Sequence, residues 1–259
     1  MNYNRPWMPL ALASITCWLP QGRASINLGS AGNFAVMGAT AVTSTGGTVL
    51  NGDLGVSTAG AISGFGPGTV SGTTYLGGTV EQLADNDATA AYNAILGEAS
   101  GQNLTGDNLG GLTVFPGVNN FSSSAQLTGT LILNAQGNPN AQFIFQIGST
   151  LTTANDASIE LINGAQADNV YWQVGSSATI GTGSVLYGNI IADTSITMTT
   201  GSSLYGSAIA LNGAVTLDDN NVSIAIIPEP NTLWAGVLCG STLVLGQGFK
   251  FWRSRRRLV

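Results

Sequence analysis

The sequence Ala178-Thr-Ile-Gly-Thr-Gly-Ser-Val-Leu-Tyr-Gly188 returns at an offset of 18 as Ile196-Thr-Met-Thr-Thr-Gly-Ser-Ser-Leu-Tyr-Gly206. A partial third copy, Val215-Thr-Leu-Asp-Asp219, follows the second at an offset of 19. Upstream, Phe145-Gln-Ile-Gly-Ser149 matches Trp172-Gln-Val-Gly-Ser176 at an offset of 27, which places Thr152 against Thr179. Self-similarity at a short period is typical of a stacked solenoid, in which each repeat forms one coil.

Alternation within each coil predicts which side chains point inward. Two apolar columns are expected inside, Ala178/Ile196/Val215 and Ile180/Met198/Leu217, with Leu186 stacked on Leu204 elsewhere in the core. The residue between these columns must point outward, because successive strand side chains alternate between faces. This outward residue is a threonine in each coil, and the residue three positions later is also polar. The two positions together predict an exposed ladder: Thr152 with Asn155, Thr179 with Thr182, Thr197 with Thr200, and Thr216 with Asp219.

One stretch follows a helical period instead. Apolar residues recur at spacings of three and four from about residue 79 to residue 100, which predicts a single α-helix with Thr79 as N-cap and Gln82 at the capping-box position. Its expected apolar face comprises Val80, Leu83, Ala84, Ala88, Ala91, Tyr92 and Ile95. Ile191 and Ile209 are apolar at outward positions of the solenoid, so we expect the helix to cover that face.

The distribution of charge limits the possible partners. Only 8% of the 259 residues are charged, and residues 24 to 249 contain no Lys, Arg or His. Twelve of the 13 acidic residues lie between residues 25 and 227. Such a surface has no cations to replace the counterions of nucleic-acid phosphates, and none to bind anionic substrates. We therefore expect no nucleic-acid partner.

Most catalytic sites are excluded by the residue types that are missing. A Ser-His-Asp triad and a His-ligated metal both need histidine, which the chain lacks. Cys17 and Cys239 both fall in terminal segments, so residues 25 to 227 have no thiol nucleophile. Asp218-Asp219 is the only adjacent acidic pair, and strand neighbours point to opposite faces, which favours a turn at the last coil. We expect a protein that is not an enzyme and has no metal or cofactor.

Residues 1–24 read as a secretory signal peptide. Arg5 is basic, residues 7–19 are apolar but too short to span a bilayer comfortably, and Gly22-Arg23-Ala24 offers a small-residue cleavage site. The alternative is an ordinary apolar N-terminal strand or helix.

The C-terminal segment, residues 228–259, has a different composition. Pro228-Glu229-Pro230 precedes an uncharged apolar run at residues 232–249, and a basic tail closes the chain. This order predicts a transmembrane helix with an inside-facing basic stop, and it resembles a PEP-CTERM sorting signal. The resemblance implies a Gram-negative envelope or exopolysaccharide context and an exosortase that cuts near the PEP motif. A plain single-span C-terminal anchor is the alternative.

Several motifs that occur in order between residues 26 and 226 resemble the microbial ice-binding protein family. They are Asn51-Gly-Asp-Leu-Gly-Val-Ser57, Leu104-Thr-Gly-Asp-Asn-Leu-Gly-Gly-Leu-Thr113, Phe121-Ser-Ser-Ser-Ala-Gln-Leu-Thr-Gly-Thr-Leu131, Ala141-Gln-Phe-Ile-Phe-Gln-Ile-Gly-Ser-Thr-Leu-Thr-Thr153, and Ile162-Asn-Gly-Ala-Gln166 through Trp172-Gln-Val-Gly-Ser-Ser-Ala-Thr179. The resemblance implies a discontinuous right-handed β-solenoid of triangular cross-section with one helix alongside, and ice binding through a flat face. Thr45-Gly-Gly-Thr48 fits the family's Thr-Ala/Gly-x-Thr/Asn motif, which the ladder copies only approximate.

The sequence thus predicts an all-β protein with one α-helix and three segments: 1–24, a solenoid at 25–227, and 228–259. The expected function is a secreted, monomeric ice-binding protein that inhibits ice growth or recrystallisation. The expected ice-binding residues are Thr152, Asn155, Thr179, Thr182, Thr197, Thr200, Thr216, Thr45 and Thr48. Signal peptidase and exosortase would be partners during export, with a transient inner-membrane anchor before the product reaches the exterior or outer cell surface. The alternative is a structural or adhesive exopolysaccharide-matrix protein.

Overall fold

The structure is a computed structural model that describes residues 25–57 and 60–224. The predicted signal peptide, PEP motif and transmembrane helix lie outside these residues. Within the described ranges, no helix is long and apolar enough to cross a membrane.

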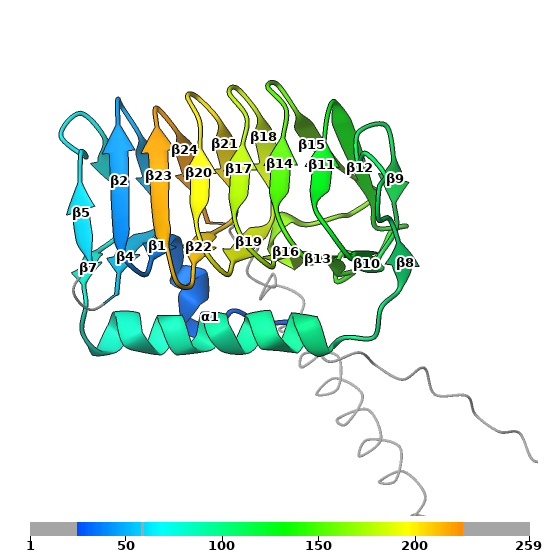
Figure 1. Cartoon of the computed structure of the whole chain (residues 1–259), viewed down its shortest axis with the longest axis horizontal. Coiled ribbons are helices and arrows are strands. Elements are labelled where there is room, and N and C mark those ends of the chain that lie inside the picture. Colours follow the sequence, from blue (N-terminus) through cyan, green and yellow to red (C-terminus); the bar gives the residue numbers. More distant parts are fainter. Residues whose placement is uncertain (1–24, 58–59, 225–259) are drawn as a thin grey trace, which may run out of the picture.

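Three parallel sheets form the three faces of a solenoid (Figure 1). Sheet A contains, in spatial order, β7 (Thr74–Leu76), β4 (Asp53–Val56), β1 (Phe34–Gly38), β22 (Ala208–Ala210), β19 (Asn189–Ala192), β16 (Val170–Val174), β13 (Phe143–Ile147), β10 (Gly117–Phe121) and β8 (Gln102–Asn103). Sheet B contains β11 (Ala125–Leu127), β14 (Leu151–Thr153), β17 (Ala178–Ile180), β20 (Ile196–Met198), β23 (Ala214–Asp218), β2 (Ala41–Thr45) and β5 (Ala61–Ser63). Sheet C contains β6 (Thr69–Val70), β3 (Val49–Asn51), β24 (Asn221–Ser223), β21 (Ser203–Tyr205), β18 (Val185–Tyr187), β15 (Ser158–Ile162), β12 (Thr130–Asn134) and β9 (Thr113–Val114).

The predicted register of the repeats is confirmed. Thr152 pairs with Thr179, Thr179 with Thr197, and Leu186 with Leu204. The two predicted inward columns are buried and belong to the main core inside the solenoid. Because each coil places the same kind of side chain above its neighbour, the core is a set of continuous apolar columns.

The coils do not follow chain order. The first coil, β1 to β3, lies between the last coil, β22 to β24, and the second coil, β4 to β6. Sheet B therefore continues from β23 to β2, two strands from opposite ends of the solenoid sequence, with Ala41 opposite Ala214 and Thr45 opposite Asp218. This arrangement agrees with the predicted discontinuous solenoid.

The helix α1 (Thr79–Gly97) connects one end of the solenoid to the other and runs along sheet A (Figure 1). Ala84, Ala88, Ala91 and Ile95 form a second core with the outward side chains of sheet A, which include Ile191 and Ile209 as predicted. A short 3₁₀ helix, η1 (Gly29–Asn33), joins this core through Ala31. Ser30 donates its backbone amide and its hydroxyl to Asp87 on α1, at 2.8 and 2.6 Å. A further 3₁₀ helix, η2 (Ala167–Asn169), precedes β16.

The detailed prediction for the helix was wrong at its N-terminus. The N-cap is Gly78, without a side-chain capping bond, rather than Thr79. Val80 and Leu83 are exposed, whereas Glu81 is buried and accepts a hydrogen bond from the Ser57 hydroxyl at 2.7 Å. The alanine and isoleucine stripe and the partly buried Tyr92 pack against sheet A, whereas the first turn makes this polar contact. The pKa of the Asp85 carboxyl, one helical turn after Glu81, is raised mainly by burial and to a smaller extent by repulsion from Glu81.

Gln146 of β13 caps the other end of this helix. Its side-chain amide donates to the carbonyl oxygens of Ile95 at 2.6 Å and Glu98 at 3.0 Å, and the residue is buried. The last carbonyls of a helix lack the usual i+4 donors. The Ile95 carbonyl also accepts from the Glu98 backbone amide at 3.1 Å, so Gln146 adds a second donor there and supplies one to the Glu98 carbonyl.

Replacing Gln146 by leucine should lower the free energy of unfolding by about 1–3 kcal/mol, because the Ile95 and Glu98 carbonyls each lose one donor while the buried volume is roughly kept. Urea unfolding of residues 25–227 measures the change. Gln102→Leu on exposed β8 is the control and should stay within about 0.5 kcal/mol. Equal stabilities for the two variants would contradict the capping role.

Candidate functional site

The outward face of sheet B carries a column of small polar side chains. We call it the central column; it comprises Gln126, Thr152, Thr179, Thr197, Thr216, Thr43 and Ser63. Thr197 and Thr43 are half-buried and the other members are exposed. Seven rungs at about 4.8 Å each give a column about 29 Å long. Alternation explains the column, since the residues on either side of Thr179 and Thr197 point into the core.

A second, lateral column lies beside the first and comprises Asn155, Thr182, Thr200, Asp218 and Thr45. The Thr182 amide donates to Asn155 Oδ1 at 3.2 Å, and the Gly201 amide donates to the Asp218 carbonyl at 3.0 Å. The predicted member Asp219 is wrong. Strand β23 runs two residues beyond its Thr, whereas β20 ends one residue after Thr197, so Asp218 takes the position next to Thr200.

Thr48 was also wrongly placed on this face. It is fully buried, where its hydroxyl oxygen accepts from the Ser44 hydroxyl at 2.8 Å and from the Asn220 amide at 3.2 Å. Gly46, with φ of +69°, turns the chain at the corner between sheets B and C, and this turn carries Thr48 inward. Thr45 does lie on the face, opposite Asp218. The Thr-x-x-Thr spacing therefore describes a turn here rather than two exposed residues.

Thr43, Ser63 and Gln126 belong to the central column but were missing from the prediction. Thr43 Oγ1 lies 3.5 Å from Thr216 Oγ1 across the junction of the first and last coils. Alternation in Ala41-Val-Thr-Ser-Thr45 could have identified Thr43, because Val42 and Ser44 are buried on either side.

The other two faces differ from sheet B. Helix α1 covers sheet A. Sheet C carries bulky outward groups: Tyr187 and Tyr205 stack with their ring centroids 4.9 Å apart, and Glu160 is exposed. The strands of the two sheets each carry one charged residue, Asp218 in sheet B and Glu160 in sheet C, so they differ in side-chain size rather than in charge. Sheet B is thus the uncovered face with the smallest and most regular side chains.

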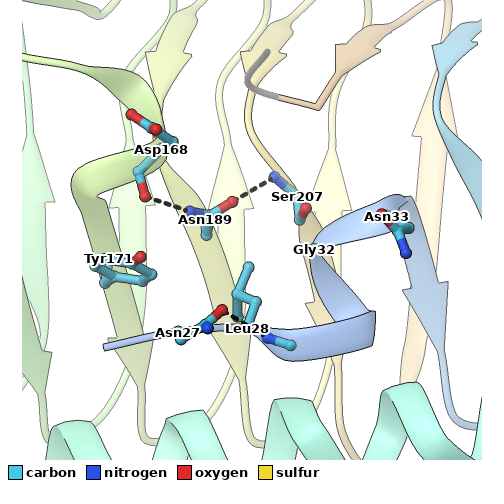
Figure 2. A pocket seen from close by; sticks show the side chains of 9 residues that line it. Asn27, Leu28, Gly32, Asn33, Asp168, Tyr171, Asn189 and Ser207 are labelled. Atoms are coloured by element: carbon cyan, nitrogen blue, oxygen red, sulfur yellow. Dashed lines mark hydrogen bonds between the residues drawn. The ribbon is translucent and has the colours of Figure 1, made fainter. Parts of the chain in front are cut away.

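A polar pocket of about 170 Å³ lies between the N-terminal segment and sheet A (Figure 2). Several of its polar groups are hydrogen-bonded within the protein. The Asn189 side chain donates to the Asp168 carbonyl at 3.4 Å and accepts from the Ser207 amide at 3.2 Å, and the Tyr171 hydroxyl donates to the Ile26 carbonyl at 3.0 Å. Burial raises the pKa of Tyr171 to about 12, so the phenol stays protonated. In the described residues no three acidic side chains come together as metal ligands.

Comparison with known proteins adds independent information. Residues 36–223 match the Ice-binding-like family. An ice-binding protein of Nostoc sp. (strain HG1) is 48% identical over 261 residues, which cover 96% of this chain and 94% of that protein.

Two crystal structures have closely similar folds. An ice-binding protein from an Antarctic biological consortium is 41% identical with a TM-score of 0.77, covering 80% of this chain and 95% of that one. An ice-binding protein from the Antarctic ascomycete Antarctomyces psychrotrophicus is 37% identical with a TM-score of 0.76, covering 79% of this chain and 100% of that one. The shared sequence, the three-faced solenoid and the helix along sheet A together establish that this chain belongs to the ice-binding-like family.

Proposed function

We propose that this protein adsorbs to ice crystals through the outward face of sheet B and thereby inhibits ice growth or recrystallisation. The observation that carries the proposal is the central column: a regular row of outward polar side chains, five of them consecutive threonines, on an uncovered parallel sheet. The Nostoc relative and both crystal structures are ice-binding proteins, which supports the same function.

The chemistry of threonine suits a solid water surface. Its methyl group favours ordered water around it, and its hydroxyl anchors that water by a hydrogen bond. Successive rungs of the central column have a fixed spacing, because β-ladder hydrogen bonds hold the strands of sheet B together. Threonine has a stiff χ1 angle, so little side-chain entropy is lost when the face docks. No step of this adsorption needs a catalytic group, a metal or a cofactor.

Partition into a slowly growing ice hemisphere tests the proposal directly. The protein to use is a fragment of residues 25–227, which contains every helix and strand of the described fold. We expect enrichment in the ice fraction and inhibition of recrystallisation, with bovine albumin as a control that ice excludes. A folded protein that partitions like albumin would contradict the function.

The matrix-protein alternative gets no support from the relatives described above. Retention on a neutral polysaccharide column without any effect on ice would favour it. Nucleic acid is an unsuitable partner, because residues 24 to 249 contain no basic side chains to neutralise its phosphates. We propose that the solenoid acts as a monomer, which light scattering of the purified protein would test.

We also propose that the chain is exported and processed at both ends, with residues 1–24 and 228–259 as removable segments. The support is the sequence pattern: a basic, apolar and small-residue start, and Pro228-Glu229-Pro230 before an apolar run and a basic tail. Signal peptidase and exosortase would act on them, with the apolar run at 232–249 as a transient inner-membrane anchor. Intact mass spectrometry of protein recovered from an exosortase-positive Gram-negative host should give a product that starts at Ser25 and ends near residue 230. A product that retains residues 232–249 would favour the plain anchor.

A further inference from the structure

The lateral column contains one residue whose chemistry differs from that of the others. Asp218 stands between Thr200 and Thr45, at the junction where the last coil meets the first. A carboxylate holds water strongly, so at first sight it interrupts a surface of hydroxyls and methyls. Its contacts, however, are directed along the column rather than toward solvent alone.

Each oxygen of the Asp218 carboxylate accepts a hydrogen bond from a neighbouring threonine. Oδ1 accepts from Thr45 Oγ1 at 2.7 Å, and Oδ2 accepts from Thr200 Oγ1. These two bonds lower the pKa of the carboxyl, with the Thr200 bond as the larger cause, so the group is ionised at neutral pH. Segments 45–47 and 199–201 carry no titratable side chain, and Asp219 is the adjacent acid.

A hydroxyl has one proton to donate and two lone pairs to accept with. Bonds to an ionised acceptor are roughly twice as strong as neutral ones. Both threonine protons therefore go to Asp218, and for Thr45 this bond is favoured over the longer 3.4 Å contact of its hydroxyl with the Leu217 carbonyl. Thr200 and Thr45 then face the solvent as acceptors in one fixed orientation. By comparison, the contact between the neutral hydroxyls Thr182 Oγ1 and Thr199 Oγ1 is longer, at 3.3 Å.

We propose that Asp218 is a positioning residue of the ice-contacting face, which orients the hydroxyls of Thr200 and Thr45 as acceptors and carries the lateral column across the coil junction. The inference rests on the proposed function. In this proposal the carboxylate orders the face. The water molecules of the ice surface donate hydrogen bonds to the oxygens of those two hydroxyls.

The neighbouring Asp219 has a different role and provides a matched control. Its side chain accepts from the Gly47 amide, and its own amide donates to the Thr45 carbonyl at 3.0 Å. Its φ of +51° lies in the left-handed region, which asparagine tolerates well. Asp219→Asn therefore keeps both backbone contacts while it removes one charge.

The experiment compares Asp218→Asn with Asp219→Asn and with Glu160→Gln on sheet C, all in residues 25–227. Asparagine keeps the shape but offers one acceptor oxygen, so one hydroxyl loses its fixed direction. We expect the concentration of Asp218→Asn that halves recrystallisation to rise about fivefold, the size of one lost hydrogen bond. Both controls should stay within about twofold of the unmodified protein. Three-bond couplings should show a rotamer-averaged χ1 at Thr45 or Thr200 in Asp218→Asn alone.

A second variant separates positioning from folding. Thr200→Val keeps the shape and removes the hydroxyl, and the double variant with Asp218→Asn should lose less than the product of the two single losses, because both act on one contact. Ice binding by the unmodified protein together with full activity of Asp218→Asn, or multiplicative losses in the cycle, would overturn the inference. An unmodified protein that ignores ice would instead overturn the proposed function.

Discussion

Thr179→Tyr combined with Thr197→Tyr should abolish ice binding while the fold is kept. The two residues are cross-strand neighbours at the middle of the central column, on β17 and β20. A tyrosine at either position projects a ring beyond the plane of the threonine side chains, so a flat crystal surface can no longer touch both columns at once. The loss in inhibiting potency should exceed about tenfold, because more than about 1.4 kcal/mol of contact free energy disappears.

The control for this variant places the same two substitutions on another face. Val185 and Ser203 are cross-strand neighbours on sheet C, with outward side chains beside the buried Leu186 and Leu204. The double tyrosine variant at these positions should keep its full activity. Circular dichroism and melting temperature should agree among all three proteins. Unchanged inhibition by a folded Thr179→Tyr/Thr197→Tyr variant would show that sheet B is not the ice-contacting face.

The repeat made most of the solenoid predictable. From one copy to the next, each inward column is marked by apolar residues at matching positions, and Ile191 with Ile209 marked the side that the helix covers. These features are local in sequence, because the repeated coils are adjacent in the chain. The stripe from Ala84 to Ile95 was predictable for the same reason, since a helical period is a local pattern.

The junction of the first and last coils could not be predicted from the repeat. Strands β2 and β23 come from opposite ends of the solenoid sequence, and their register depends on how the whole solenoid closes rather than on any local period. Thr43 was missed because its strand lies outside the repeated copies, although local alternation marks it as outward. Asp218 was confused with Asp219 because β23 extends one residue further past its threonine than β20 does. Thr48 was misplaced because the same spacing of two threonines can span either an exposed strand or a corner, and Gly46 makes it a corner. At the helix N-terminus, the buried Glu81 shows that a polar contact with Ser57 outweighed the apolar pattern.

Trp172→Ala should produce the largest loss of stability among the substitutions considered. Trp172 is 1% exposed and stacks on Phe145 of the adjacent coil, with ring centroids 3.9 Å apart and an interplanar angle of 7°. Its Nε1 donates to the Tyr187 carbonyl at 3.0 Å. Removing a buried aromatic side chain leaves a cavity that the close-packed coils cannot fill, so the free energy of unfolding should fall by about 3–5 kcal/mol.

The same experiment includes two further variants: one separates the hydrogen bond from the ring stacking, and the other is a surface control. Trp172→Phe keeps a stacked ring but removes the donor to the Tyr187 carbonyl, so it should cost less than the alanine variant. Tyr205→Ala removes an aromatic ring of a similar stacked pair on the surface, where Tyr205 is 39% exposed, and should cost no more than about 1.5 kcal/mol. Urea unfolding of residues 25–227 gives all three values. Because Trp172 belongs to sheet A and its side chain is buried in the core rather than on the outward face of sheet B, a folded Trp172→Phe variant should retain full ice binding. A loss below about 1 kcal/mol for Trp172→Ala would mean that the coils relax around the missing ring, and that the continuous core columns are less rigid than the ice-contacting face requires.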